Sequence, residues 1–403
     1  MASAPRQEEP RGAWYALVAC VVTILFAAGA RSSLAVFLVP IETDLKLDRA
    51  TLSTAGALTV LAFGLGSPLA GVLATRFGAR QVMMASVALM ALSGFGVAFA
   101  QQAWHLYLFA GLIPGLGFAG ASGVPGTVLL AKWFGRRLGL ATGIMSSAIP
   151  AGQGLFVPFA AFLILESGWR FAYLALGLLL AAVALPVLGW LASEPAQETA
   201  DLARAPVVPP RVVADVWLLG IGYFACGFTD QFVGLHMVAL ASDAGLDPLL
   251  AAGSLSVLLV AGIFGSVASG PLADTYNPYL ILAGTYLLRA LTMPLLLVVG
   301  PGPGLWALGA FALLFGITYI TNLAAGARLV RDRYGVQSVG ALSGTVGLAH
   351  QVGGSIGIGI GGLSVSLAGG YGPAIVLATF VVLAGGLTQF LIPVAQRRRD
   401  TAG

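Results

Sequence analysis

Charged residues and cysteines are scarce in this chain. Only 9% of its 403 residues are Asp, Glu, Lys or Arg, and 58% are hydrophobic, whereas soluble domains are about 25% charged. This composition excludes an ordinary soluble fold and indicates an integral membrane protein. The two cysteines, Cys20 and Cys226, both fall in apolar stretches, so neither a disulfide framework nor a metal cluster is indicated, and we interpret both as packing residues.

Long apolar segments recur along the whole chain. A helix of about 20 apolar residues crosses the hydrocarbon of a bilayer, and these runs are continuous rather than alternating, which favours helices over membrane strands. The sequence therefore predicts an all-α membrane protein with twelve transmembrane helices. They are expected at 14–40, 51–75, 81–100, 104–131, 138–163, 171–191, 216–240, 249–273, 279–299, 305–327, 340–366 and 374–394.

Signals for other protein classes are missing too. The N-terminal MASAPRQEEPRGA is too polar for a signal peptide, so the first run is expected to stay in the membrane. No H-E-x-x-H motif, Walker loop or metal-ligand spacing occurs, and the connecting loops are too short for a catalytic domain. We expect neither an enzyme, nor a resident metal or cofactor, nor a nucleic-acid partner.

The basic residues predict the orientation. Of the 20 Lys and Arg residues, fifteen lie at the termini or in the even-numbered breaks, and three, Lys46, Arg49 and Arg170, lie in odd-numbered breaks. The positive-inside rule therefore predicts that both termini are cytoplasmic. The remaining two basic residues, Arg31 and Arg289, lie inside predicted spans.

A single acidic residue, Asp230, also lies inside a span, which leaves one positive charge in the membrane without a counter-ion. A charge at that depth is expensive and usually functional. A bound anion would balance it, and Arg31 is the residue we expect to hold that anion. The alternative is that Arg31 snorkels toward the outer interface on its long side chain.

The chain also repeats itself. GVLATRFGARQ from Gly71 and GPLADTYNPYL from Gly270 follow the second and eighth spans, 199 residues apart. The sequence thus predicts two six-helix bundles, at 14–191 and 216–394, joined by a cytoplasmic linker at 192–215. Repeated halves are typical of transporters that rock about a site at the membrane midplane. The same offset places Arg31 and Asp230 at equivalent positions of the two halves.

These features resemble the major facilitator superfamily over essentially the whole chain. Gly71, Arg76, Gly78 and Arg80 match its loop motif between helices 2 and 3, and these residues are expected to form gating contacts. Thr75 stands where members of the family generally carry an aspartate. Asp274 fills the corresponding place in the second half and is the matching gating candidate.

Two further segments are similar to monocarboxylate-porter and oxalate/formate-antiporter-like permeases. RGAWYAL precedes the first span, and KWFGRRLGLATGIMSSAIPAG, from Lys132, opens the fifth. Arg31 lies within one residue of the cation that such transporters carry in helix 1. Many of these relatives also have an arginine in helix 8 where this chain has Ser266, so their substrates cannot be carried over. The resemblance implies alternating-access transport of a small carboxylate, often with a proton, by a monomer in the cell membrane, here a bacterial inner membrane.

The fold that the resemblance implies places helices 1, 4, 7 and 10 around a central cavity, with helices 2, 5, 8 and 11 beside them. The polar residues expected to bind substrate there are Arg31, Gln153, Tyr319, Asn322, His350 and Gln351. Tyr319 and Asn322, three residues apart, are expected to share one helix face. For this pair, and for His350, a hydrogen bond between neighbouring helices is the structural alternative.

Proton coupling is predicted for Asp230 and His350, because a histidine titrates near neutral pH. Arg289 lies at a depth similar to that of Asp230, so we expect a buried ion pair that leaves Arg31 available to substrate. The leading hypothesis is proton-coupled transport of a small organic anion, with a monocarboxylate as the expected cargo. The alternative is an efflux permease for a hydrophobic or drug-like compound, since the same fold serves both.

Overall fold

The computed structural model describes residues 11–134, 138–193, 214–319, 322, 325, 326, 329 and 336–391. Within these ranges the side chains at 75, 131, 138–140, 214, 215, 266, 267, 270, 271, 273–275 and 336–345 are not described. Every regular element of the described ranges is helical, in agreement with the predicted all-α fold.

The first half of the chain supplies elements α1 to α9. In chain order these are α1 Arg11–Ser32, α2 Leu34–Leu45, α3 Arg49–Phe77, α4 Ala79–Ala98, α5 Ala103–Leu106, the π-helical η1 Tyr107–Leu112, α6 Ile113–Ala121, α7 Gly123–Ala131, α8 Leu138–Leu179, the π-helical η2 Leu180–Ala184 and α9 Leu185–Leu191.

The second half supplies elements α10 to α16. They are α10 Ala214–Asp243, α11 Pro248–Thr275, α12 Pro278–Thr292, the 3-10 turn η4 Met293–Val298, α13 Pro303–Ile317, α15 Val336–Ala368 and α16 Gly372–Gln389.

Each predicted span is mainly helical where the structure describes it, with short interruptions such as those at Ser33, Ser122 and Thr318. Ten described helices are long and apolar enough to cross a membrane, and Pro303–Ile317 is a shorter apolar helix. One of the ten, Ala141–Leu191, covers nearly all of the fifth predicted span and the whole of the sixth, and it is kinked at Gly168. Gly168 has a φ of 81°, a backbone conformation that glycine adopts without strain, so one helix gives way to the next at a single residue.

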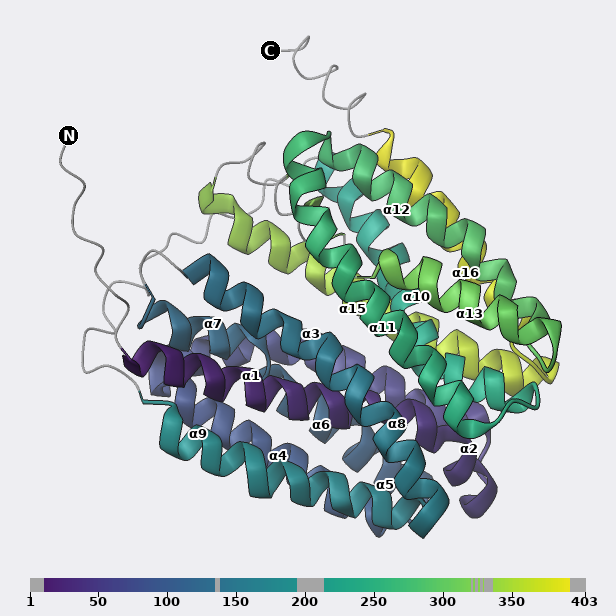
Figure 1. Cartoon of the computed structure of the whole chain (residues 1–403), viewed down its shortest axis with the longest axis horizontal. Coiled ribbons are helices and arrows are strands. Elements are labelled where there is room, and N and C mark those ends of the chain that lie inside the picture. The colour runs from purple at the N-terminus through teal and green to yellow at the C-terminus, as the bar shows by residue number, and fades with distance from the viewer. Residues whose placement is uncertain are drawn as a thin grey trace.

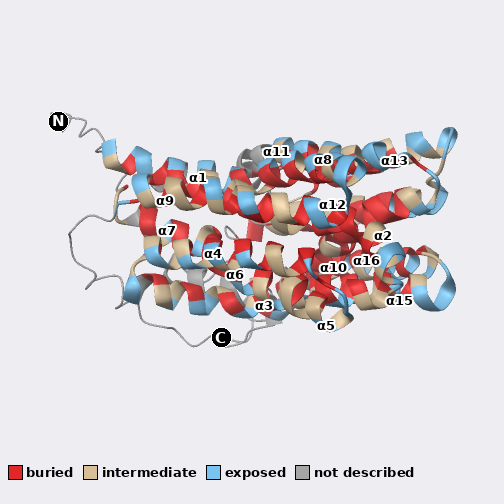
Figure 2. Cartoon of the chain, turned by 90° about the horizontal axis from the view of Figure 1, so that it is seen from below, coloured by how far each residue is buried: buried red, intermediate tan, exposed pale blue. Residues whose placement is uncertain are grey.

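Two groups of helices lie side by side along the molecule. Figure 1 shows α1 to α9 gathered in one group and α10 to α16 in the other, with the described N- and C-terminal helix ends, the start of α1 and the end of α16, toward one end. Buried residues concentrate between the helices, while exposed residues follow their outer faces (Figure 2). The division into 14–191, 192–215 and 216–394 stays a prediction, because most of the linker lies outside the described residues.

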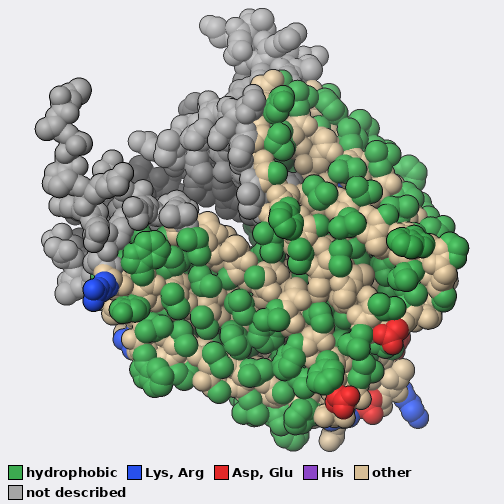
Figure 3. Space-filling view, viewed as in Figure 1, with side chains coloured by type: hydrophobic (Ala, Val, Ile, Leu, Met, Phe, Trp, Pro, Cys, Tyr) green, Lys and Arg blue, Asp and Glu red, His purple; other side chains and the backbone are tan. Residues whose placement is uncertain are grey.

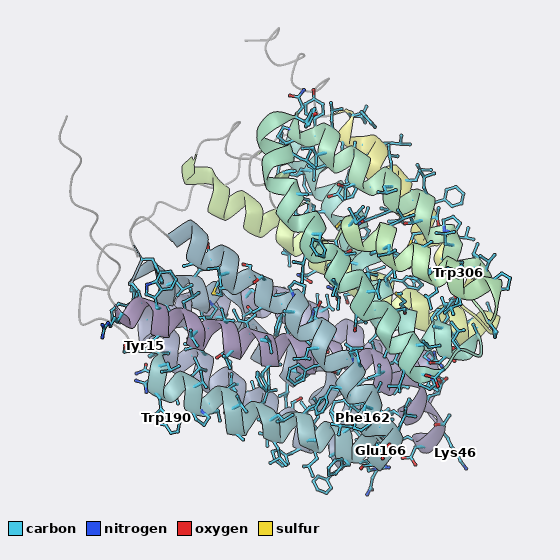
Figure 4. All side chains as sticks on the ribbon, in the orientation of Figure 1. Tyr15, Lys46, Phe162, Glu166, Trp190 and Trp306 are labelled. Atoms are coloured by element: carbon cyan, nitrogen blue, oxygen red, sulfur yellow. The ribbon has the colours of Figure 1, made fainter. Side chains whose placement is uncertain are left out.

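The outer surface suits a lipid environment. On the face seen in Figure 3 hydrophobic side chains predominate, and charged side chains appear only near its edges. Large aromatic residues mark the ends of the helices: Tyr15 and Trp190 lie at one end, and Trp306 lies toward the other (Figure 4). Trp190 and Trp306 are 84% and 83% exposed, as expected where amphipathic rings meet the membrane interface. Which end faces the cytoplasm stays a prediction from the charges.

The two halves touch along an antiparallel pair, α3 and α15. Two hydrogen bonds join the pair, beginning at the first turn of α3. The backbone N–H of Ala50 donates to Ser366 Oγ at 3.1 Å, and Ser355 Oγ donates to the carbonyl of Ala57 at 3.1 Å. Gly64 approaches Gln351 so closely that a Cβ at Gly64 would lie 2.8 Å from the Gln351 Cβ. The contact therefore covers the part of α3 that begins at Ala50, which closes this end of the molecule.

Arg49 is the centre of the closed end. Its guanidinium is buried, with its side chain 4% exposed, and forms ion pairs with Glu42 of the first half and Asp243 of the second. Arg49 also donates to the hydroxyl of Tyr371 at 2.7 Å. That hydroxyl lies 3.1 Å from Nδ1 of the fully buried His236. We call these five residues the Arg49 clasp; four of its members come from helix ends that meet across the two halves.

Arg49→Gln should open the closed end more often, because removing one member of a buried charge cluster leaves the others uncompensated. The reporter is Ser53→Cys, a near-isosteric change at a fully buried position against Gly362. The native cysteines are buried and give little background. We expect maleimide labelling of this cysteine to accelerate at least about tenfold, which corresponds to about 1.4 kcal/mol.

Arg170→Gln is the matched control. Arg170 pairs with Asp44, a residue of the same half, and both side chains are about half exposed, so labelling should not change. Equal labelling in the Arg49→Gln and parent proteins would show that the clasp does not hold the halves together.

Candidate functional site

A cavity of about 610 Å³ lies between the two halves, beyond the Arg49 clasp. We call it the central cavity. Its walls come from α1, α2, α3 and α8 of the first half and from α10, α11, α15 and Tyr319 of the second. Four of the predicted site residues line it together: Arg31, Gln153, Asp230 and Tyr319. The fourth predicted span, residues 104–131, is expected to line the centre of the cavity, but none of its residues belongs to this wall.

Arg31 is placed by a break in the first span. α1 ends at Ser32 and α2 begins at Leu34, with the Ser33 hydroxyl donating back to the carbonyl of Gly29 at 2.8 Å. Arg31 therefore occupies the last turn of α1, where unpaired carbonyls and the helix dipole favour a cation. The break places a positive charge at the cavity wall instead of continuing an apolar helix.

The guanidinium of Arg31 lies against two aromatic rings. Its Cζ is 4.8 Å from the ring centroid of Phe118 and 5.6 Å from that of Phe63. Nε is buried with no hydrogen-bond partner, and no ion pair to Arg31 occurs in the part of the chain that the structure describes. The snorkelling alternative does not fit, because the side chain lines cavities inside the molecule.

Asp230 of α10 forms an ion pair with Arg289 of α12, with Oδ1 and Nη1 separated by 2.7 Å. The Arg289 side chain is completely buried, and that of Asp230 is 6% exposed. The pair is not aligned as a hydrogen bond, so Oδ1 accepts none. Oδ2 is 3.3 Å from both Cys226 Sγ and His350 Nε2. A carboxylate at the cavity wall thus has one oxygen free of hydrogen bonds.

Arg289 gains further partners from the end of α13. That helix stops at Ile317, and Arg289 donates from Nε to Thr318 Oγ1 at 2.9 Å and from Nη2 to the Thr318 carbonyl at 2.8 Å. A helix C-terminus attracts a cation, so the buried guanidinium is held by a carboxylate and a helix end together. Arg289 Nη1 also lies 3.1 Å from Cys226 Sγ. Cys226 is packed in a buried hydrophobic cluster, as expected, and in addition contacts both members of the ion pair.

His350 reaches Asp230 through close packing of α10 and α15. A Cβ added at Gly227 would collide with the carbonyl oxygen of His350, and one added at Gly353 would collide with that of Phe224. Glycine at these positions lets the two backbones approach. The His350 side chain is 17% exposed, unlike that of Arg289, so protons can reach it more readily.

Three predicted polar residues are placed differently from one another. Gln153 is buried and lines the central cavity. Gln351 is not part of that wall; it lies against Gly64 of α3, and its Oε1 is buried without a partner. Asn322 is buried too, and its backbone carbonyl accepts a hydrogen bond from Tyr223 at 2.9 Å. Tyr319 lies in a turn that follows the end of α13, and the two residues between it and Asn322 lie outside the described ranges, so the shared helix face of the pair stays a prediction.

The predicted gating residues lie at the end near the termini. Gly78, with a φ of 96°, ends α3 and starts α4, while Arg80 donates to the carbonyl of Gly189 at 2.6 Å within the same half. Arg76 is exposed beside Phe77, and Gly71 faces Val124. The side chain of Asp274 lies outside the described residues, as does that of Thr75.

Sequence reasoning missed the Arg49 clasp. The charge pattern identifies Arg49 only as one of three basic residues on the sparsely charged side of the membrane. Glu42, Asp243 and Tyr371 lie at or next to helix ends in the structure, where acidic and aromatic residues are common. Pairing them requires knowing which helix ends meet.

Family comparison agrees with this architecture. The model of the Major Facilitator Superfamily matches residues 20–357 and, in a second match, residues 219–402. An uncharacterized transporter of this type, YcxA from Bacillus subtilis, is 26% identical, with 93% of each chain covered. Monocarboxylate transporter 13 from Bos taurus is 28% identical, covering 96% of this chain and 91% of the relative.

Solved structures share the fold at low identity. A bacterial homolog of the human lysosomal transporter Spinster aligns with a TM-score of 0.71 and 17% identity over 96% of both chains. The nucleoside transporter NupG aligns with a TM-score of 0.69 and 14% identity, covering 96% of this chain and 99% of that one.

Asp230→Asn should destabilise the protein strongly, because it leaves the fully buried Arg289 without its counter-ion. Loss of one partner of a buried pair costs about 3–5 kcal/mol. We expect the Tm in detergent to fall by roughly 5–15 °C, and the double variant Asp230→Asn with Arg289→Gln to recover much of that loss.

Asp44→Asn serves as the control, because it breaks the half-exposed pair with Arg170 and should change stability by less than about 1 kcal/mol. A double variant no more stable than Asp230→Asn would contradict the account of Arg289 as an uncompensated charge.

Proposed function

Because the chain belongs to the major facilitator superfamily, we propose that it is a secondary active transporter for a small organic anion, specifically a monocarboxylate, and that a proton moves with it. The two halves would expose the central cavity to alternate sides of the membrane, as is usual for transporters built from repeats. The Arg49 clasp supports this proposal, since it joins the two halves at one end of the cavity.

The unpaired guanidinium of Arg31 is the observation that carries the proposal. Its aromatic neighbours interact with the charge through their ring faces, which leaves the N–H edges of the guanidinium for an acceptor. A carboxylate matches those edges with two parallel hydrogen bonds. A neutral cargo would not balance the positive charge of Arg31 and would gain little binding energy from it.

The charges of the site favour an anion over a cation. Arg289 is balanced by Asp230, whereas Arg31 has no acidic partner in the described ranges. One net positive charge thus lies at the cavity wall, where the low dielectric strengthens its attraction for an anion. The relatives named monocarboxylate transporters support the same class of cargo.

His350 is the residue that we assign to the coupled proton, with Asp230 as its hydrogen-bond acceptor. Protonating Asp230 would deprive the buried Arg289 of its counter-ion, whereas protonating His350 adds a second cation beside the same carboxylate. The 3.3 Å separation of His350 Nε2 and Asp230 Oδ2 suits such a shared proton. Asp230 therefore takes part in coupling by stabilising the protonated histidine.

Arg31→Gln should abolish saturable uptake of small monocarboxylates into proteoliposomes, because the neutral amide cannot balance the charge of the cargo. A charged, hydrogen-bonded contact is worth about 1.5–3 kcal/mol, so at least about a tenfold loss is expected. Arg31→Lys keeps the charge but loses the two-pronged geometry and should retain partial uptake. Unchanged uptake of an acid by Arg31→Gln would refute the proposed site, and selective uptake of neutral hydrophobic compounds would favour the efflux alternative.

His350→Gln should separate proton coupling from substrate binding. We expect accumulation driven by an inward proton gradient to fall about tenfold or more, while exchange of labelled for unlabelled acid at equal pH stays within about threefold. The exposed His105, which stacks on Trp104, supplies the control His105→Gln. Gradient-driven accumulation that survives in His350→Gln would place the proton elsewhere.

A further inference from the structure

A second cavity, of about 450 Å³, lies inside the first half of the molecule. We call it the bundle cavity. Its walls come from α1, α2, α3, α4, η1, α6, α8 and η2. It shares Arg31, Leu34 and Thr59 with the central cavity, so the two spaces adjoin at the guanidinium.

The bundle cavity offers few hydrogen-bond donors. Apart from Arg31 its lining is mainly aliphatic, aromatic and glycine residues. Two of the three hydroxyls in its wall donate to backbone carbonyls: Ser93 to that of Phe109, and Thr59 to those of Ala55 and Ala110, the latter at 2.8 Å. The third hydroxyl is that of Tyr173. An occupant must therefore be mainly apolar except where it meets Arg31 or the Tyr173 hydroxyl.

Both π-helical segments found in the described ranges form part of this wall. Phe109 and Ala110 come from η1, and Leu180 comes from η2. A π-bulge widens one turn of a helix and is frequent at functional sites. The carbonyls of Phe109 and Ala110 are the ones that accept the hydroxyls of Ser93 and Thr59, so the irregular turn is held open by specific bonds rather than by loose packing.

We propose that the bundle cavity is an apolar subsite that holds the hydrocarbon part of the cargo while its carboxylate binds Arg31. This inference rests on the proposed function and narrows it: the preferred substrates are monocarboxylates with an apolar body of several carbons. Acids with several polar groups along the body are disfavoured, because those groups would lose their hydration where only the Tyr173 hydroxyl could meet them.

The physical consequence is a dependence of affinity on chain length. Each methylene that moves from water into the cavity should tighten binding about fourfold, the equivalent of about 0.8 kcal/mol per buried CH₂. The gain should stop when the cavity is full. If the cargo lay only in the central cavity, substitutions in the wall of the bundle cavity would not change the chain length at which the gain in affinity stops.

The test measures the Kd of unbranched monocarboxylates from acetate to octanoate by thermal stabilisation of the purified protein in detergent. Arg31→Gln gives the background from partitioning of the longer acids into micelles. Ala30→Leu places a larger side chain at the wall of the bundle cavity and should shorten the optimal chain. Leu180→Ala enlarges the same cavity and should lengthen it.

Gly253→Ala is the matched control. Gly253 lines neither cavity, and a Cβ there meets nothing within 4 Å. This variant should leave both the optimal chain length and the affinity for acetate unchanged within about threefold. Because Ala30→Leu and Leu180→Ala shift the optimum in opposite directions, either one alone decides the question if the other fails to fold.

Arg31-dependent binding with the same chain-length optimum in every variant would overturn the subsite and leave the proposed function intact. A stabilised Ala30→Leu protein with unaltered selectivity would show that the cavity is only a packing gap. If no acid binds in an Arg31-dependent way, the proposed function itself fails.

Discussion

Two guanidiniums buried among membrane-spanning helices have to be compensated, and the structure compensates one of them completely. Arg289 has a carboxylate from Asp230 and the C-terminal end of α13. Arg31 has the last turn of its own helix and the faces of two phenylalanine rings. The difference between these two environments leaves a positive charge at the cavity, and the assignment of an anionic cargo follows from it.

The irregular backbone of the molecule gathers around its two cavities. The break between α1 and α2 lies beside Arg31, the end of α13 caps Arg289, and η1 and η2 widen the wall of the bundle cavity. Nonhelical or widened turns are tolerated at membrane depth only where protein groups satisfy their hydrogen bonds. Ser33, Thr318, Ser93 and Thr59 belong to such arrangements. The apolar helices are thus regular where they face lipid and are modified where polar chemistry is needed.

The lengths of the apolar segments predicted the helices, because a segment of about 20 uncharged apolar residues is long enough to cross the bilayer as a helix. Arg31, Asp230 and Arg289 could be singled out from the sequence because charged residues are rare inside apolar spans. What sequence could not supply was contact between distant helix ends, such as Arg49 with Asp243, or a local change of helix type, such as η1. It also could not foresee the turn at Thr318 and Tyr319, because the apolar pattern continues through both residues. Side-chain pattern predicts the helices well, whereas the packing of one helix against another decides which polar groups meet.

The close approach of α10 and α15 at Gly227 and Gly353 has a consequence for the evolution of such a protein. The same glycines that bring His350 to Asp230 would collide with backbone carbonyls if a methyl group were added. Variation at these two positions is therefore limited by geometry even though neither side chain has chemistry of its own. If His350 and Asp230 carry the proposed proton coupling, a lineage that changes its ion dependence is expected to exchange these two side chains in place, with the helix crossing kept fixed.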